Sequence, residues 1–457
     1  MKPVNQSLPD GLLLAFVGDD FTGSAASMEV MTFAGLPTVL FFAPPTPEQA
    51  ARFDGMRGIG LAGTMRSQRR EWMQRNLPEL FRWLRDTGAP VCHYKICSTF
   101  DSSPEIGSIG CAADIAAGIF DGWMPVMPAA PPIRRYQAFG NLFAAGPGGV
   151  ARLDRHPVMS CHPATPMQEA DIRAVLATQT RADVGLISLE DLTDDAAANA
   201  AWQREWSQGR KLMAVDTVSV ADLAMVGGLL WRMSGDGMMA IGSQGVEYAL
   251  VAHWQRMGLL GPAPSARGAG VADQIIVVSG SASAVTAAQI DHAAAHGFTT
   301  LALDAANCLR DRTAIGGTVC EALDALSAGR SVLIHSIKGP GDPSFAAFRA
   351  AAEQRGLTID AANNELGEML GQILAELLDQ TGLKRAAISG GDTSSHATKQ
   401  LGIYALTALA PTIPGAALCQ AHSDQTGRQG LELALKGGQM GSPDYFDWIR
   451  RGGGSLR

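Results

Sequence analysis

The sequence predicts a two-domain α/β protein in which each domain has a mainly parallel sheet flanked by helices. Short apolar runs alternate with stretches of helical periodicity along most of the 457 residues, which is the pattern of repeated βαβ units. One segment rich in Pro, Gly, Ala and Ser, residues 258–270, interrupts this alternation. Hydrophobic residues make up 46% of the chain and charged residues 18%, so each domain can bury a core.

The first half of the chain opens with a βαβ unit. An apolar strand is expected over 12–17, a turn over 18–24, a helix over 25–34 and a second strand over 38–42, with a right-handed crossover. Residues 129–165 carry several prolines and are expected to be irregular, and a loop of that length is usually functional or flexible. The remaining expected strands cover 59–62, 91–96, 123–127, 184–189, 211–215 and 238–241, and the helices cover 67–84, 109–119, a stretch ending near 207, and 221–231.

A second alternating series follows the interruption. Its expected strands cover 275–278, 300–303, 332–337 and 386–388, and its helices cover 284–296, a stretch ending near 328, and 363–381. We therefore expect an N-terminal domain over residues 1–257, a linker over 258–273 and a C-terminal domain over 274–457. Ligands of parallel sheets bind at the carboxyl ends of the strands, so the loops directly after the apolar runs are the candidate sites.

Composition excludes several classes of protein. The net charge is 36 − 44 = −8 and no basic tract occurs, which argues against nucleic acid or an anionic membrane as a partner. The seven cysteines are odd in number and form no CxxC pair, so we expect free thiols in a reducing cytoplasm. The first apolar run is too short for a membrane span and lacks the flanks of a signal peptide.

Two adjacent carboxylates, Asp19 and Asp20, follow the first strand. Neighbouring carboxylates repel each other and resist burial unless a cation, a metal or a substrate hydroxyl offsets them. The pair therefore favours a functional site. Asp20 also stands directly before a helix, where an Asp often serves only as an N-cap.

Two further strand ends of the first half carry cations. Lys95 lies in an apolar strand and is followed by hydroxyl and carboxylate groups that include Asp101 and Ser102. A lysine is rarely buried without a partner, so this segment suggests an oxyanion or polyol pocket, although an edge strand with a Ser/Thr-rich turn would look the same. Arg66 follows another strand and could bind a carboxylate or simply face solvent. Cys97 lies nearby, but no local signature supports it as a nucleophile.

Two loops of the second half have the composition of phosphate-binding turns. Residues 279–283 (SGSAS) and 389–395 (SGGDTSS) each follow an apolar strand and precede a helix. Glycine lets the backbone approach a ligand, and the free N–H groups of a helix N-terminus attract an anion. Two such loops in one domain indicate a nucleotide. A third glycine segment, KGGQMG at 436–441, follows an apolar stretch near the end of the chain.

Standard nucleotide motifs are absent from these loops. No GxxxxGK[ST] sequence occurs, which excludes a P-loop protein, and no GxGxxG follows a strand. The missing glycine fingerprint also makes a nicotinamide oxidoreductase on the same sheets a poor reading of the sequence. The residues alone therefore indicate an anion site and a nucleotide site without specifying the reaction.

Taken together, the loops resemble those of the four-carbon acid sugar kinase family, and the resemblance covers nearly the whole chain. The family's strand-DDFTG turn matches residues 19–23, and its YKxCSTFDS segment matches 94–102. Its HPxTPM segment matches 162–167, its SGSxS loop matches 279–283, and its GG(E/D)TSS loop matches 390–395. Each motif is modest by itself, and their combination in this order is specific.

The resemblance implies an ATP-dependent kinase that phosphorylates a terminal hydroxyl of a small sugar acid of the 3-oxo-tetronate, threonate or erythronate type. It implies an acid-binding N-terminal domain, a nucleotide-binding C-terminal domain, and ATP and Mg²⁺ as cofactors, with the metal ligands unassigned. The implied substrate-site residues are Asp19, Asp20, Arg66, Lys95, Asp101 and Ser102. The implied ATP-site residues are Ser279, Ser281, Ser283, Gly390, Gly391, Asp392, Thr393 and Gly437.

The chain departs from the family pattern in two places. After Ser102 most members continue with a basic residue, Gly and Asn, whereas this chain has the longer segment 103–110. The C-terminal KSGNFG of many members is KGGQMG here, at residues 436–441, so both glycines of the family pattern are kept. Because the first departure lies in the substrate half, a branched five-carbon acid of the 3-oxo-isoapionate type is an alternative substrate. A non-catalytic sugar-acid-binding protein on the same fold is the alternative from another class.

These residues lead to a mechanistic hypothesis. Phosphoryl transfer depends on positioning and charge neutralisation, so Arg66 and Lys95 would bind the acid while one of Asp19 and Asp20, with Asp20 preferred, takes the hydroxyl proton. Mg²⁺ would bridge the phosphates of ATP, and closure across the linker would exclude water. An isologous homodimer is the default expectation for the oligomeric state.

Overall fold

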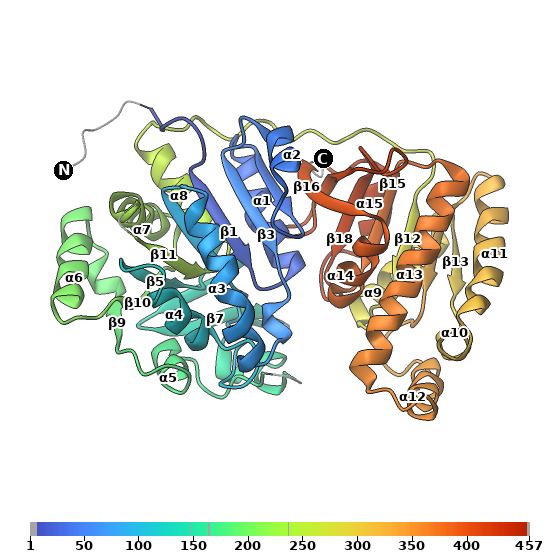
Figure 1. The fold of residues 1–457 in the computed structure, drawn as a ribbon, viewed down its shortest axis with the longest axis horizontal. Helices are drawn as coiled ribbons and strands as arrows, with labels where there is room; N and C mark the ends of the chain where they lie inside the picture. Colours follow the sequence, from blue (N-terminus) through green and yellow to red (C-terminus); the bar gives the residue numbers. More distant parts are fainter. Residues whose placement is uncertain (1–6, 147, 163–164, 236, 455–457) are drawn as a thin grey trace. The chain divides into compact units, whose positions relative to one another are not determined.

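The computed structural model describes residues 7–146, 148–162, 165–235 and 237–454. The chain divides into two compact units, Met1–Pro264 and Ser265–Arg457. Each unit contains a sheet flanked by helices, which confirms the predicted fold class (Figure 1). No helix in the described part of the chain is long and apolar enough to cross a membrane.

The N-terminal unit has an eight-stranded sheet whose strands all run parallel. In sheet order the strands are β2 (Thr38–Phe41), β3 (Gly58–Ala62), β1 (Leu14–Gly18), β4 (Val91–Lys95), β11 (Met239–Gly242), β5 (Met124–Met127), β10 (Leu212–Val215) and β9 (Val184–Ile187). The central strands are buried along their whole length, as strands covered on both faces must be.

The helices that cover this sheet form two groups, and within each group neighbouring helices contact one another (Figure 1). One group consists of α3 (Arg70–Asp86), α4 (Ile109–Ala117) and α5 (Ile172–Ala177). The other consists of α1 (Phe21–Phe33), α8 (Gly245–Arg256), α7 (Val220–Met233) and α6 (Asp195–Ser207), and the short α2 (Pro47–Ala50) lies after β2. In α3, Met73, Leu77, Phe81 and Leu84 recur at helical spacing and are buried, so the apolar stripe in the sequence is the face that packs.

The stretch expected to be irregular contains regular structure instead. Strands β6 (Arg135–Ala138), β7 (Asn141–Gly146) and β8 (Gly149–Arg152) form a small antiparallel sheet. The strands are short, and the prolines that surround them hid their pattern. The buried carboxylate of Asp216, at the end of β10, accepts hydrogen bonds from the backbone N–H groups of Phe139 and Gly140, which ties this sheet to the unit.

The C-terminal unit has a seven-stranded sheet in which six strands run in one direction and only β17 runs antiparallel to its neighbours. In sheet order the strands are β13 (Phe298–Ala302), β14 (Ser331–His335), β12 (Ile276–Ser279), β15 (Arg385–Ser389), β18 (Glu432–Lys436), β17 (Leu418–Ser423) and β16 (Ile403–Ala410). The antiparallel pair β16–β17 is absent from the sequence prediction, because its alternation of apolar and polar residues is weak.

Helices cover this second sheet as well (Figure 1). On one side α9 (Ala284–Ala295) and α15 (Tyr445–Arg450) pack on a buried cluster that includes Val277, Ile290 and Phe446. The expected helix ending near 328 is two helices, α10 (Ala305–Arg310) and α11 (Ile315–Ser327). The remaining helices are α12 (Ser344–Gln354), α13 (Ile359–Thr381) and α14 (Gly391–Gln400).

Candidate functional site

The charged loops of the N-terminal unit meet at the carboxyl edge of its sheet, between β1 and β4. The chain leaves β1 toward β2 on one side of the sheet, and β4 lies on the other side, so this edge is a topological switch point. Gly18 pairs with Lys95 in register, and the backbone N–H of Asp19 donates to the Lys95 carbonyl at 2.8 Å. The register therefore brings the end of β4 beside the two carboxylates that follow β1.

Asp20 is the N-cap of α1 and also forms an ion pair. Its carboxylate accepts hydrogen bonds from the backbone N–H of Gly23 at 3.0 Å, from the Thr22 hydroxyl at 2.7 Å and from Arg66 Nη2 at 2.7 Å. Burial would raise the pKa of Asp20, but Arg66 and Lys95 outweigh it, so that pKa is lowered. An N-cap role and a site role for Asp20 are thus compatible, because the same carboxylate caps α1 and pairs with Arg66.

Asp19 has the opposite electrostatic setting. Its Oδ2 accepts a hydrogen bond from the Cys97 backbone N–H at 3.3 Å, whereas its buried Oδ1 has no hydrogen-bond partner. Burial, and next the charge of Asp20, raises the pKa of Asp19 to about 7. One carboxylate of the pair is therefore held ionised, while the other can gain or lose a proton near neutral pH.

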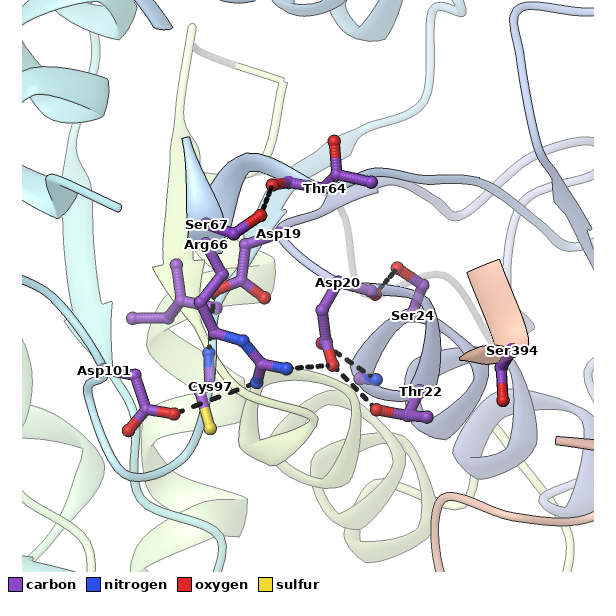
Figure 2. A network of polar contacts seen from close by, with 12 residues as sticks. Asp19, Asp20, Thr22, Ser24, Thr64, Arg66, Ser67, Cys97, Asp101 and Ser394 are labelled. Atoms are coloured by element: carbon purple, nitrogen blue, oxygen red, sulfur yellow. Dashed lines mark hydrogen bonds and ion pairs between the residues drawn. The ribbon is translucent and has the colours of Figure 1, made fainter. Parts of the chain in front are cut away.

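Arg66 lies between two acidic groups (Figure 2). It comes from the 3₁₀ turn η2 (Met65–Ser67), and its backbone N–H donates to the Asp19 carbonyl at 3.0 Å. Its guanidinium contacts Asp20 at 2.7 Å and reaches Asp101 at 3.9 Å. A planar guanidinium with a third of its side chain still exposed keeps donors for a further carboxylate or hydroxyl.

Lys95 is buried, and its Nζ donates to the Ile96 carbonyl at 2.8 Å. Gly23 leaves room for this ammonium group, because a Cβ at Gly23 would lie 2.5 Å from Nζ and 2.3 Å from the Asp20 carboxylate. The edge-strand interpretation of Lys95 is wrong, since β4 is a central strand with partners on both sides. The lysine therefore adds positive charge directly beneath the Asp20 turn.

Cys97 has the surroundings of a thiol that stays protonated. Burial, and next the charge of Asp101, raises its pKa to about 11. Its Sγ lies 3.0 Å from the hydroxyl of Thr99, which in turn lies 2.8 Å from Asp101 Oδ1. These contacts orient the loop after β4 and leave no thiolate for nucleophilic chemistry near neutral pH.

Ser102 makes internal contacts. Its hydroxyl donates to the Gln179 side-chain carbonyl at 2.9 Å and accepts from the Ile109 backbone N–H at 3.0 Å. Gln179 also accepts from the Gly110 backbone N–H at 3.0 Å. The hydroxyl is thus committed to holding the start of α4 against the end of α5.

We expect Ser102→Ala to reduce the free energy of unfolding by about 1–3 kcal/mol, because it leaves the buried Ile109 backbone N–H without its acceptor and removes one donor to the Gln179 oxygen. The KM for the acid substrate should stay within about twofold, since the hydroxyl faces other protein groups. Thermal melting and steady-state kinetics measure the two effects. A large rise in KM at unchanged stability would instead place Ser102 in contact with the substrate.

The segment 103–110 packs against the Arg66 loop. Ile106 forms an antiparallel bridge with Arg69, and the Gly107 backbone N–H donates to the Gln68 carbonyl at 2.9 Å. Gly107 has φ +57, and a Cβ there would lie 2.5 Å from the carbonyl oxygen of Arg66. Residues that depart from the family pattern therefore support the backbone that carries the site arginine.

Arg135 is a candidate site residue that sequence reasoning missed. It lies in β6, within the stretch expected to be irregular, and its buried Nε has no hydrogen-bond partner. Burial lowers the pKa of Arg135, whereas the nearby groups Cys97 and Asp101 raise it. A third cation, carried by a strand of the small antiparallel sheet, thus lies near the acidic loop after β4.

The described part of the HPxTPM segment forms a local turn. His162 Nδ1 lies 3.1 Å from the Thr165 backbone nitrogen and 3.0 Å from its hydroxyl. Pro163 and Ala164 lie outside the described residues. No contact recorded for His162 or Thr165 reaches the carboxylates of the site within the described chain.

The glycine loops of the C-terminal unit line a cavity of about 270 Å³. They lie after β12 and β15, and this edge is again a switch point because the chain leaves β12 toward β13 while β15 lies on the other side. Among the predicted nucleotide residues, Ser281, Gly390, Gly391 and Thr393 line the cavity. The other lining residues include Gly280, Ser336, Phe345, Phe348, Asn363 and Gly438.

Close approach of the two loops requires glycine. A Cβ at Gly280 would lie 2.3 Å from the Thr393 hydroxyl, and one at Gly390 would lie 2.8 Å from it. Gly390 also has φ +123, which side chains disfavour. Gly391, the first residue of α14, has no atom within 4 Å of an added Cβ, so the space in front of this helix N-terminus is open to a ligand.

The serines of the first loop bond to one another and to Thr286 and Gly438. The Ser281 backbone N–H donates to the Ser279 hydroxyl at 3.4 Å, and the Ser283 backbone N–H donates to the Ser281 hydroxyl at 3.3 Å. Ser279, Ser283 and Gly437 do not line the cavity, whereas Gly438 does. The side chain of Asp392 lies outside what the structure describes.

The cavity can accept a nucleotide by its chemistry. Backbone groups of the glycine loops can approach phosphates, and the aromatic side chains of Phe345 and Phe348 offer apolar surface for a base. Ser389 and Ser395 have buried hydroxyls without hydrogen-bond partners. Within the described ranges no group of three or more His, Cys, Asp or Glu side chains could hold a metal ion.

Family models match both units. A sugar-binding N-terminal domain matches residues 14–250, and a nucleotide-binding C-terminal domain matches residues 276–446. These two matches coincide with the acidic site of the first unit and the glycine-lined cavity of the second.

Known proteins are similar over nearly the whole length. The chain is 45% identical over 448 residues to the 3-oxo-isoapionate kinase of Paraburkholderia graminis, which covers 97% of this chain and 95% of that protein. It is 30% identical over 445 residues to the 3-oxo-tetronate kinase of Pseudomonas fluorescens, covering 95% of each. A crystal structure of a Salmonella typhimurium LT2 protein named as a tRNA synthase has a TM-score of 0.78 at 25% identity, covering 96% of this chain and 98% of that one.

Proposed function

Since the chain belongs to the four-carbon acid sugar kinase family, we propose that it transfers the γ-phosphoryl group of ATP to a terminal hydroxyl of 3-oxo-isoapionate. That the chain is a kinase of small sugar acids follows from its two domains and its relatives. The proposal adds the identity of the acid. The observation that carries it is the markedly greater identity to the 3-oxo-isoapionate kinase than to the tetronate kinases.

A second feature supports a substrate other than the unbranched four-carbon acids. The segment 103–110 departs from the family pattern and contacts the backbone of residues 66–70. A change in this segment therefore alters the support of Arg66, which we assign to the substrate. A branched acid needs a pocket of a different shape from that for an unbranched four-carbon acid. We assign this difference in shape to the segment 103–110.

We assign the binding of the acid to the cations around the β1–β4 edge. A third of the Arg66 side chain is exposed, the buried Lys95 adds positive charge beneath the Asp20 turn, and Arg135 adds positive charge near Asp101. A carboxylate or 3-oxo group bound there would meet charge-assisted donors. Asp20 keeps Arg66 in place through the 2.7 Å ion pair, and Asp101 adds a weaker contact.

We assign the proton acceptor to Asp19 in preference to Asp20, which the sequence alone favoured. The Asp20 oxygens accept three hydrogen bonds and its pKa is lowered, so it is a weak base. Asp19 has a buried oxygen without a partner and a pKa of about 7. A base with a pKa near the working pH is the more effective proton acceptor.

The reaction then balances without other groups. The substrate hydroxyl oxygen forms a bond to the γ-phosphorus, the bond from that phosphorus to the β–γ bridging oxygen breaks, ADP leaves, and the hydroxyl proton passes to Asp19. Gly390, Gly391 and the N-terminus of α14 would hold the phosphates. Mg²⁺ would neutralise charge on the β- and γ-phosphates, held mostly by those phosphates and water with at most one or two carboxylates.

A panel of acids tests the proposal. ADP release coupled to a detectable reaction should show a kcat/KM for 3-oxo-isoapionate at least about tenfold above that for 3-oxo-tetronates, threonate and erythronate. The reverse order would assign the chain to the tetronate kinases. Binding of an acid without ADP release on any of them would favour the non-catalytic alternative. We place the reaction in the cytoplasm, because ATP is available there.

A further inference from the structure

Lys436 is a fully buried lysine at the carboxyl end of β18, next to the glycine-lined cavity. It pairs in register with Ser389 of β15, and its carbonyl accepts a hydrogen bond from the Gly390 backbone N–H at 2.8 Å. The sequence placed this residue in a glycine segment without assigning it a role. Its position puts an ammonium group at the same edge of the C-terminal sheet as the two glycine loops, one strand beyond β15.

The hydrogen-bond partners of Lys436 Nζ are uncharged. The ammonium donates to the carbonyls of Gly437 and Gly438 at 2.9 and 3.4 Å, and to the Thr286 hydroxyl at 3.3 Å. No carboxylate in the described part of the chain forms an ion pair with it. The other buried cations of this unit, Arg385 and Arg428, each have an acidic partner.

A buried cation without a counter-charge is unfavourable for the protein alone. Burial lowers the pKa of Lys436 to about 8, so most of the side chains still carry the charge at pH 7. Replacing such a charge by a neutral side chain would relieve the desolvation penalty, so packing alone does not account for it. The charge therefore calls for an anionic partner that the protein itself lacks.

The nearest place for such an anion is the cavity. Gly438, whose carbonyl bonds to Nζ, lines it, and so does Ser281, whose hydroxyl lies 3.0 Å from that of Thr286. The turn formed by Gly437 and Gly438 therefore separates the Lys436 ammonium from the cavity. In a medium of low dielectric constant, the charge of this ammonium acts strongly on a phosphate bound in the cavity.

We propose that Lys436 is the cation that holds the phosphates of the nucleotide, acting from behind the turn formed by Gly437 and Gly438. The inference rests on the proposed function, because it takes the cavity to be the nucleotide site. Lys436 is a positioning residue in this role. A lysine that merely held the turn by hydrogen bonds would be replaceable by a neutral donor, and this difference is what the experiment measures.

The test compares Lys436→Gln with Lys399→Met in the full-length protein. The Gln side chain keeps a donor for the turn and removes the charge, while Lys399 is an exposed lysine of α14 in the same unit. We expect Lys436→Gln to weaken ATP and ADP by about tenfold or more, AMP by less, and adenosine by under about twofold. Its melting temperature without ligand should be unchanged or higher, and Lys399→Met should behave as the wild type.

Three results for the Lys436 variants would overturn the proposal. Equal loss of affinity for adenosine and ADP would show that Lys436 shapes the pocket instead of acting on phosphate. Retained ADP affinity in Lys436→Gln would show that hydrogen bonding, not charge, is its role. If Lys436→Gln does not fold, Lys436→Met is measured in its place, and failure of both to fold would assign the residue to stability. Wild-type protein that binds no nucleotide would instead contradict the proposed function.

Discussion

Replacing Asp19 by Asn should lower kcat by about 10²- to 10⁴-fold, the usual contribution of a positioned general base. The change removes the carboxylate whose buried oxygen lacks a partner and keeps nearly the same shape. Binding of ATP should persist, because the glycine-lined cavity belongs to the other unit. Steady-state kinetics of ADP release, together with nucleotide titration, separate the two effects.

The pH dependence gives an independent readout of Asp19. A base must be deprotonated to act, so wild-type kcat/KM should fall as the pH drops below about 7, and the residual activity of Asp19→Asn should lose that dependence. The stability effect has the opposite sense from a salt-bridged carboxylate. Because the folded-state pKa is raised above the ordinary value of 3.8, the wild type loses stability as the pH rises from about 4 to about 7. At pH 8, Asp19→Asn should therefore melt higher than the wild type.

Asp20→Asn is the matched control. Asn still accepts the N-cap hydrogen bond from Gly23, but it loses the charge that pairs with Arg66. We expect a raised KM and a smaller loss of kcat, since the arginine is freed but the proton acceptor remains. If Asp20→Asn loses most turnover while Asp19→Asn stays within about threefold of the wild type, the base is Asp20.

Gly391→Ala should weaken ATP and ADP by about tenfold or more without harming the fold. The new methyl group meets no atom within 4 Å, and Gly391 begins a helix with no positive φ, so the protein has room for it. That room is the space in which phosphate would approach the backbone N–H groups of α14. Calorimetric titration with ADP and thermal melting without ligand measure both sides of the prediction.

Gly316→Ala is the corresponding control in a helix that contributes no residue to the glycine-lined cavity. It lies near the start of α11 and also has nothing within 4 Å of an added Cβ. Both variants should melt at or slightly above the wild-type temperature, because Ala is favoured over Gly in a helix by about 0.5–1 kcal/mol. Only Gly391→Ala should lose nucleotide affinity. Unchanged ADP binding in that variant would show that the phosphates lie elsewhere.

Much of the fold could be predicted from the sequence, because strands of a doubly wound sheet are short, apolar and bounded by glycine. The expected strand at 12–17 is β1, Leu14–Gly18, and the expected strand at 386–388 is β15, Arg385–Ser389. The misses have physical reasons. The strands β6 to β8 lie among prolines, and in the antiparallel pair β16–β17 polar residues such as Thr407, Gln420 and His422 interrupt the apolar runs.

The site residues show the same division between local and tertiary information. Asp19 and Lys95 stand at strand ends and could be picked out by their position after an apolar run. That they are neighbours depends on the pairing of β1 with β4, strands more than 70 residues apart in the chain. Arg135 and its nearness to Asp101 depend on the small antiparallel sheet, for which the sequence offered no pattern.

The sequence by itself determined the two alternating series, the loops that follow their strands, and through those loops the kinase family. These features are local, since hydrophobic periodicity and turn residues act within a few positions of one another. Tertiary structure decided which of the adjacent carboxylates has an oxygen without a hydrogen-bond partner. It also decided that Lys436 is buried without a counter-charge and that both sites lie at switch points. Those properties depend on strand order and on burial, and both arise from contacts between residues far apart in the chain.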